Sequence, residues 1–150
     1  MKTILFFIKA WLLVGVLDII AAMFSFYLST GKSPLIVLKF IATSVQGAEA
    51  YAGGTTSILL GLALHFSVAF LFTLFFFLIY KPLKLDRYNS YLTGILYGIF
   101  IWLVMNKLVL PMTSVKQQAF QWLEAGKAML ILVAMIGLPL AFMLKKRKNG

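Results

Sequence analysis

Residues 57–80 read SILLGLALHFSVAFLFTLFFFLIY, a stretch that contains no Lys, Arg, Asp or Glu. At a rise of about 1.5 Å per residue, a helix over this stretch is about 36 Å long, which is enough to cross a hydrocarbon core of about 30 Å. An apolar run of this length predicts a transmembrane helix.

Three further apolar runs are long enough for the same role. The four predicted spans cover residues 4–28, 57–80, 91–110 and 128–144. The 150 residues are 62% hydrophobic and 12% charged, whereas soluble domains have about 25% charged residues. A chain this short cannot bury so much apolar surface, and the surface must therefore face lipid. We predict one all-α integral membrane domain, residues 1–150, that forms a four-transmembrane-helix bundle.

The basic residues predict the orientation of the spans. Of the fourteen Lys and Arg residues, nine fall on the side of the two termini and five on the other side. The nine are Lys2, Lys9, Lys81, Lys84, Arg87, Lys145, Lys146, Arg147 and Lys148. Because Lys and Arg are retained in the cytoplasm, both termini should be cytoplasmic. Aromatic residues near the span ends fit an interfacial belt: Trp11, Tyr27, Tyr51, Tyr80, Tyr88, Tyr91 and Trp122.

Residues 34–46, in the first outer connection, predict a separate helix. Pro34 follows Ser33, as at a helix start, and apolar residues then recur at helical spacing with polar residues between them. One interpretation is an amphipathic helix in the outer membrane interface. The alternative is a helix that packs over the end of the bundle.

Small side chains recur about every four residues on one face of each span. Because lipid provides no hydrophobic force between helices, such stripes predict helix contacts. In the fourth span the stripe is Gly126, Leu130, Ala134, Gly137 and Ala141. The opposite faces, which include Phe75, Phe76 and Phe77, are expected to meet lipid, and Pro139 is expected to bend the fourth span.

The outer half of the predicted bundle contains the polar residues of the spans. Asp18 lies about 15 Å below the outer end of its span, and His65 lies about 12 Å below the outer end of the second. The candidate polar cluster is Asp18, His65, Asn106 and Lys107. A candidate outer cap above it is Gln46, Glu49, Gly53 and Gly54.

Ionisable groups within a membrane cost about 2.5–3.5 kcal/mol, so a helix keeps one when it has a partner or a task. Asp18 and His65 are natural partners, and one hypothesis is a site for a proton or a small cation that opens outward. The alternative is that these side chains form interhelical hydrogen bonds, each worth about 0.6 kcal/mol. Lys107 is expected to reach the outer headgroups.

Composition excludes several kinds of chemistry. The chain has no Cys and one His, so it cannot by itself provide a disulfide, a thiolate metal site or a haem held by two histidines. We therefore expect no cofactor, no metal site and no catalytic residue. The net charge of +10 is explained by residues that flank apolar runs, and nucleic acid is not an expected partner.

Several ordered motifs carry a resemblance. They are Pro34-Leu35-Ile36-Val37-Leu38-Lys39-Phe40-Ile41-Ala42, then Gly47, Ala50 and Gly53-Gly54, then Leu60-Gly61-Leu62-Ala63-Leu64-His65-Phe66, then Leu96-Tyr97-Gly98, Met105-Asn106 and Val109-Leu110-Pro111. In this combination, over most of its length, the chain resembles an uncharacterised family of small bacterial inner-membrane proteins with four transmembrane helices. The resemblance implies a bacterial inner membrane and carries no activity.

Three functions remain open at this point. The first is a non-catalytic accessory or assembly subunit of a larger membrane complex, with other membrane subunits and lipids as partners. The second is a small transporter or proton-coupled exchanger that works as a homo-oligomer and uses Asp18 and His65. The third is a protein that binds, or acts on, a lipid or a quinone beneath the outer helices.

Overall fold

The computed structural model describes residues 1–115, 119 and 121–149. Four helical segments of the described chain are long and apolar enough to cross a membrane. They are α1 (Lys2–Thr30), α3 (Gly54–Tyr80), the third span (Ser90–Met112) and the fourth span (Trp122–Arg147). The structure confirms the all-α fold with four transmembrane helices, and the chain is a multi-pass membrane protein.

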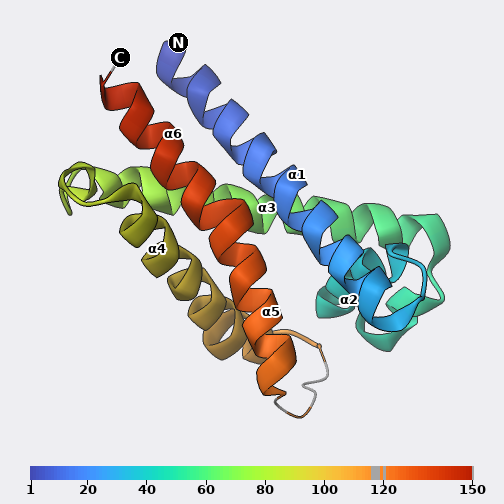
Figure 1. Cartoon of the computed structure of the whole chain (residues 1–150). Coiled ribbons are helices and arrows are strands. Elements are labelled where there is room, and N and C mark those ends of the chain that lie inside the picture. Colours follow the sequence, from blue (N-terminus) through green and yellow to red (C-terminus); the bar gives the residue numbers. More distant parts are fainter. Residues whose placement is uncertain (116–118, 120, 150) are drawn as a thin grey trace.

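The third and fourth spans are each interrupted by one wide turn. The third consists of α4 (Ser90–Val104), the π-helical turn η3 (Met105–Val109) and η4 (Leu110–Met112); the fourth consists of α5 (Trp122–Leu132), the π-helical turn η5 (Val133–Gly137) and α6 (Leu138–Asn149). Each π-helical turn ends two residues before a proline, Pro111 or Pro139. A proline ring lacks an N–H and collides with the carbonyl four residues earlier, and the wider turn accommodates both effects. The effect of Pro139 is therefore a wide turn within the fourth span. The helices α5 and α6 follow one another across this turn as one continuous segment (Figure 1).

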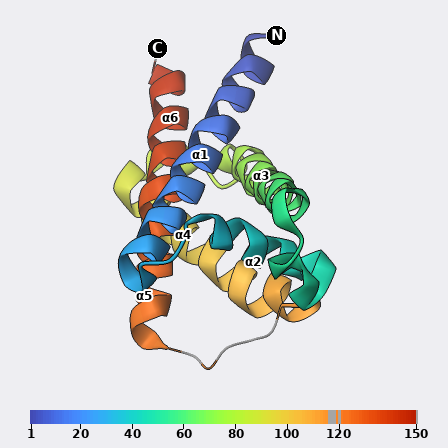
Figure 2. The same ribbon diagram turned by 90° about the vertical axis from the view of Figure 1, so that its right-hand side faces the viewer.

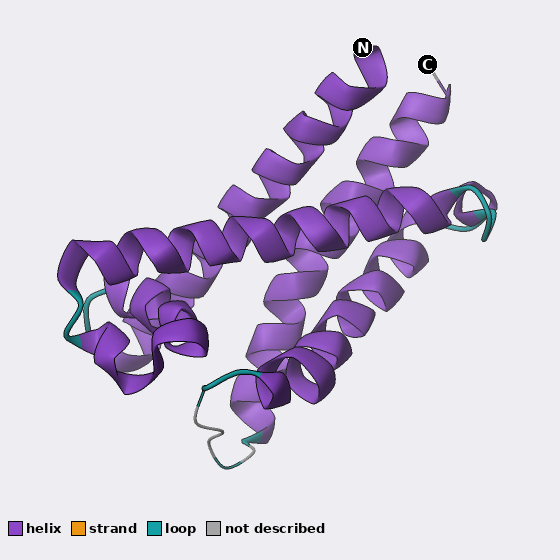
Figure 3. Ribbon diagram, turned by 180° about the vertical axis from the view of Figure 1, so that it is seen from behind, coloured by secondary structure: helices purple, strands orange, loops and turns teal. Residues whose placement is uncertain are grey.

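The long helices do not all run in the same direction across the molecule. The helix α1, the fourth span and α4 lie side by side, whereas α3 lies across them (Figures 1 and 3). The helices α1 and α3 pack closely at Gly15, where an added methyl group would lie 2.7 Å from the Phe66 ring and 3.6 Å from Ala69 Cβ. Nearer the termini, Phe7 contacts the rings of both Phe70 and Phe77, at centroid distances of 5.2 and 5.1 Å. Aromatic rings therefore fill the space between the crossing helices.

The helix α4 meets the fourth span through glycine. A methyl group built on Gly98 would lie 2.5 Å from Val133 Cα, and one on Gly137 would overlap the Gly94 carbonyl oxygen. The two backbones are in direct contact, as the small-residue stripe predicts. That prediction is wrong for Gly126, Leu130 and Ala134: an added methyl group on Gly126 would meet no atom within 4 Å, and Leu130 and Ala134 are exposed. The contact with α4 is made by Val133 and Gly137.

The core lies where α1, α3, α4 and α6 meet. Val14, Phe76, Ile101 and Leu140 are at most 1% exposed in this cluster. The expectation that Phe76 faces lipid is wrong, because Phe76 contacts the Tyr97 ring at a centroid distance of 4.4 Å. Its neighbour Phe75 is 41% exposed, since one residue along a helix rotates the side chain out of the core.

The connection between α1 and α3 forms α2 (Leu35–Gln46) and the short helix η1 (Gly47–Tyr51). Leu38, Ala42 and Thr43 are the buried residues of α2. An added methyl group on Gly61 would overlap the Leu38 carbonyl oxygen, so α2 packs directly on α3. This matches the alternative of a helix packed over the bundle end, and its position in the outer interface stays a prediction.

Both termini project from one end of the molecule, and the connection of residues 81–89 lies below them, beside α6 (Figures 1 and 2). This region is here called the terminal end. Arg147 Nη2 donates to Thr3 Oγ1, and its guanidinium lies 4.8 Å from the centre of the Phe6 ring. Lys145 Nζ donates to the Tyr88 carbonyl over 3.0 Å. These contacts join α6 to α1 and to the connection.

Candidate functional site

The structure brings Asp18 of α1 and His65 of α3 together at the point where the two helices cross. His65 Nδ1 lies 4.0 Å from Asp18 Oδ2, and the His65 and Asp18 side chains are 11% and 15% exposed. Gly15 makes the contact possible, because it is one turn from Asp18 on α1 and lets the neighbouring Phe66 approach. The pairing that helical spacing suggested is therefore present within one chain.

The hydrogen bond on the other ring nitrogen fixes the proton arrangement of His65. His65 Nε2 lies 2.9 Å from the Gly15 carbonyl oxygen, and a carbonyl can only accept, so Nε2 must carry a hydrogen. The opposite nitrogen, Nδ1, then faces the Asp18 carboxyl group. Any proton exchanged within the pair would therefore lie on Nδ1 or on the Asp18 carboxyl group.

The distance within this pair limits what it does in this conformation. A separation of 4.0 Å between Nδ1 and Oδ2 allows electrostatic attraction and exceeds the length of a hydrogen bond. Direct proton transfer between Asp18 and His65 would require the two side chains to approach by about 1 Å. The shorter contact of His65 is the bond to the Gly15 backbone.

A second bond at this crossing involves Trp11, which the sequence placed in the interfacial aromatic belt. Trp11 Nε1 donates to the Phe66 carbonyl over 2.8 Å, and its ring meets Phe70 edge-on at 5.4 Å. The two bonds run in opposite directions, from Trp11 to α3 and from His65 to α1. The sequence did not predict this bond, because Trp11 was assigned to the interfacial belt.

Asn106 and Lys107, the other members of the candidate cluster, have different surroundings. Asn106 Nδ2 donates to the Trp102 carbonyl over 2.9 Å, within its own span and across the start of η3. Lys107 is exposed on the same turn. Of the candidate cluster, Asp18 and His65 contact each other, whereas the side-chain hydrogen bond of Asn106 stays within its own span.

The residues of the candidate outer cap, all of them described, also have different surroundings and form no hydrogen bond or ion pair with the Asp18–His65 pair. Gln46 Oε1 accepts the hydroxyl hydrogen of Ser57 over 2.7 Å, which ties the end of α2 to the start of α3. Ser57 is two turns from His65, so this bond lies about 12 Å from the imidazole along α3. Glu49 is exposed, and Gly53 and Gly54 form the turn into α3, where Gly54 has a φ of +58° that favours glycine.

Tyr97 supplies a further interhelical bond that sequence reasoning did not identify. Its hydroxyl donates to the Phe72 carbonyl over 2.5 Å, which links α4 to α3. Tyr97 lies one residue before Gly98, in the part of α4 that contacts both α3 and the fourth span. Among the described residues, no group of three His, Asp or Glu side chains is close enough to hold a metal ion.

No family model, curated protein or solved structure matches this chain.

Proposed function

We propose that the chain is a non-catalytic accessory or assembly subunit of a larger complex in the bacterial inner membrane. The observation that supports this most directly is the use of the polar side chains within the spans. Trp11, His65 and Tyr97 each bond to a backbone carbonyl of a neighbouring helix. These groups stabilise the arrangement of α1, α3 and α4, which is what a structural subunit requires.

Both termini are proposed to be cytoplasmic, because the terminal end collects most of the basic residues. Single cysteines can test this, since the natural chain has none. Gly150→Cys should be labelled from the cytoplasm, and Ala48→Cys, in the exposed part of η1, should be labelled from outside. Labelling of both from one side, or of each from the opposite side, would contradict the proposed orientation.

The subunit proposal can be tested by combining purification with complementation. A tagged chain, extracted from its native membrane in mild detergent, should retain a partner protein in fixed stoichiometry. Deletion of the gene should lower the amount of that partner's assembled complex, and the wild-type chain should restore it. Recovery of the chain only as a monomer or a homo-oligomer would contradict the proposal.

The contact between Asp18 and His65 favours one alternative, a small oligomeric proton-coupled transporter. The double variant Asp18→Asn with His65→Gln separates the two functions, because both new side chains keep hydrogen-bonding groups and neither exchanges a proton near neutral pH. A structural subunit should still restore the partner complex with this variant. A transporter should lose proton-coupled flux in liposomes while the protein remains folded.

A further inference from the structure

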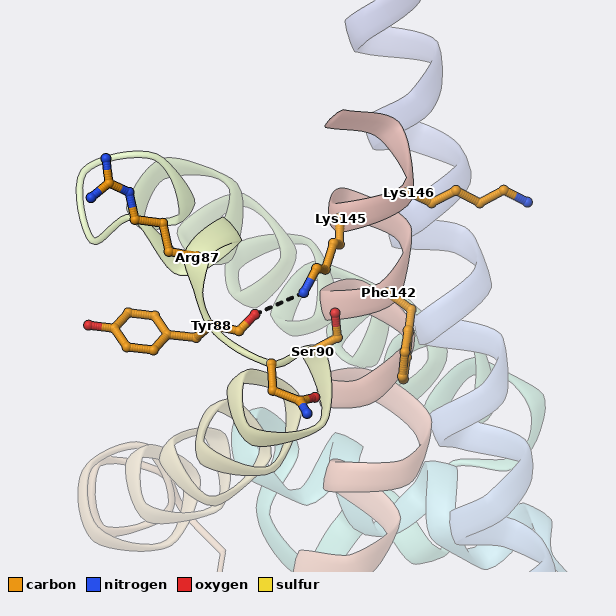
Figure 4. A pocket seen from close by; sticks show the side chains of 7 residues that line it. Arg87, Tyr88, Ser90, Phe142, Lys145 and Lys146 are labelled. Atoms are coloured by element: carbon orange, nitrogen blue, oxygen red, sulfur yellow. Dashed lines mark hydrogen bonds between the residues drawn. The ribbon is translucent and has the colours of Figure 1, made fainter. Parts of the chain in front are cut away.

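A pocket of about 460 Å³ opens at the terminal end, between the connection of residues 81–89 and α6. Lys145 points from α6 toward this connection, where its Nζ donates to the Tyr88 carbonyl (Figure 4). Arg87 and Lys146 also line the pocket, but their charged ends point away from it, Arg87 past the connection and Lys146 past α6 (Figure 4). The volume lies within the range of small-ligand sites, about 300–1,000 Å³.

The charge of the lining favours an anion. Arg87, Lys145 and Lys146 are all cationic, and no residue that lines the pocket is acidic. Asp86 precedes Arg87 in the sequence and is not part of the lining. Lys145 directs its ammonium group at the pocket, and the charges of Arg87 and Lys146 flank it, so the pocket favours a phosphate group over a neutral ligand.

Hydrogen-bond donors are available beside these charges. An ammonium group has three N–H donors, and the Tyr88 carbonyl uses one of those of Lys145. Asn89 accepts the Tyr91 N–H through Oδ1, an arrangement in which its amide nitrogen still carries two hydrogens. The Ser90 hydroxyl also borders the pocket. The lining therefore offers both charge and directed donors to an oxyanion.

An apolar surface adjoins this basic pocket. Phe142 lines the pocket and contacts the Tyr91 ring edge-on at a centroid distance of 4.9 Å. Phe142 is 42% exposed and Tyr91 is 60% exposed. Both rings belong to the ends of apolar transmembrane helices, where the headgroup region meets the hydrocarbon core. A free phosphate would use the cations alone, whereas a phospholipid would use the cations and these rings.

We propose that this pocket binds the headgroup phosphate of an anionic phospholipid, whose acyl chains lie over Tyr91 and Phe142. Lys145 contacts the phosphate, the long exposed side chains of Arg87 and Lys146 turn toward it, and the bound lipid bridges the connection of residues 81–89 and α6. Such a lipid would strengthen the contact that Lys145 already makes with Tyr88.

The test is a titration of the purified full chain in detergent, followed by native mass spectrometry. Dioleoylphosphatidylglycerol should bind at least about tenfold more tightly than the zwitterionic dioleoylphosphatidylcholine. Because each cation that turns to the bound phosphate adds a charge-assisted hydrogen bond, Arg87→Gln with Lys146→Gln should weaken phosphatidylglycerol binding at least about tenfold. Both side chains are exposed, so this variant should remain folded.

The matched control is Lys2→Gln with Lys81→Gln, which removes the same charge from exposed positions at the terminal end outside the pocket. Its affinity should change by less than about twofold. Lys145→Gln keeps a donor for the Tyr88 carbonyl but removes the charge directed at the pocket, and it should weaken binding at least about tenfold. Equal losses in the pocket variant and the control, or equal affinity for the two lipids, would overturn the proposal.

A competition experiment distinguishes the lipid from a free phosphate ester. Glycerol 3-phosphate carries the same phosphate without acyl chains, and it should displace phosphatidylglycerol only at concentrations at least about a hundredfold higher. Displacement at comparable concentrations would show that the pocket recognises the phosphate ester alone and would overturn the assignment to a lipid.

Discussion

The crossing of α1 with α3 and the contact of α4 with the fourth span are built by different means. At the first, Trp11 and His65 send hydrogen bonds to the opposite backbone, and aromatic rings fill the remaining space. At the second, Gly98 and Gly137 let two backbones touch. Lipid contributes no hydrophobic force at either place, so each must gain its stability from specific contacts. The polar crossing should tolerate isosteric substitution, whereas the glycine contact should tolerate no added side chain.

The largest expected effect is at the glycine contact. Gly137→Ala should destabilise the fold by about 2–3 kcal/mol, because the new methyl group meets the Gly94 backbone, which cannot move independently. Reversible unfolding in mixed micelles with increasing dodecyl sulfate measures this change. The matched control is Gly126→Ala, whose methyl group meets open space and should be neutral or stabilise by up to about 1 kcal/mol. Equal changes in the free energy of unfolding for Gly137→Ala and Gly126→Ala would contradict the importance of the glycine contact.

A smaller effect is expected at the polar crossing. Trp11→Phe keeps an aromatic ring between α1 and α3 and removes only the hydrogen bond to the Phe66 carbonyl. The loss should be about 0.6 kcal/mol, the average for interhelical hydrogen bonds in membrane proteins, when it is measured by the same unfolding method. A loss above about 2 kcal/mol would mean that packing of the indole, and not its N–H, dominates the contact.

The smallest effect is expected for Asn106, whose hydrogen bond stays within the third span. Asn106→Ala should cost no more than about 0.5 kcal/mol, and its effect should be additive with that of His65→Gln. A coupling energy above about 0.5 kcal/mol between these two substitutions would indicate that Asn106 does belong to the polar pair.

The sequence predicted much of this fold because membrane-spanning helices leave long apolar runs and small-residue stripes. It also paired Asp18 with His65 correctly in space, since helical spacing and depth sufficed for that. It did not predict that α3 lies across the other spans, because a periodic pattern gives the contacting face of a helix and not its crossing angle. The burial of Phe76 was missed for a similar reason, since three consecutive Phe residues point in three directions.

The hydrogen bonds of Trp11 and Tyr97 were also beyond sequence reasoning. Their partners are backbone carbonyls, which every residue carries and which leave no compositional signal. Asn106 was grouped with Asp18 and His65 on the basis of depth alone, and depth does not determine which helix face a side chain occupies. The contacts in the folded chain supply that missing information.

The central claim is that Asp18 and His65 join α1 to α3 within the membrane. A double-mutant cycle tests it most directly, with Asp18→Asn, His65→Gln and the double variant compared by unfolding in mixed micelles. If electrostatic attraction across 4.0 Å couples the two side chains, the coupling energy should be about 0.5–1.7 kcal/mol, the range for interacting polar side chains between membrane helices. Strictly additive effects of the two substitutions would contradict it.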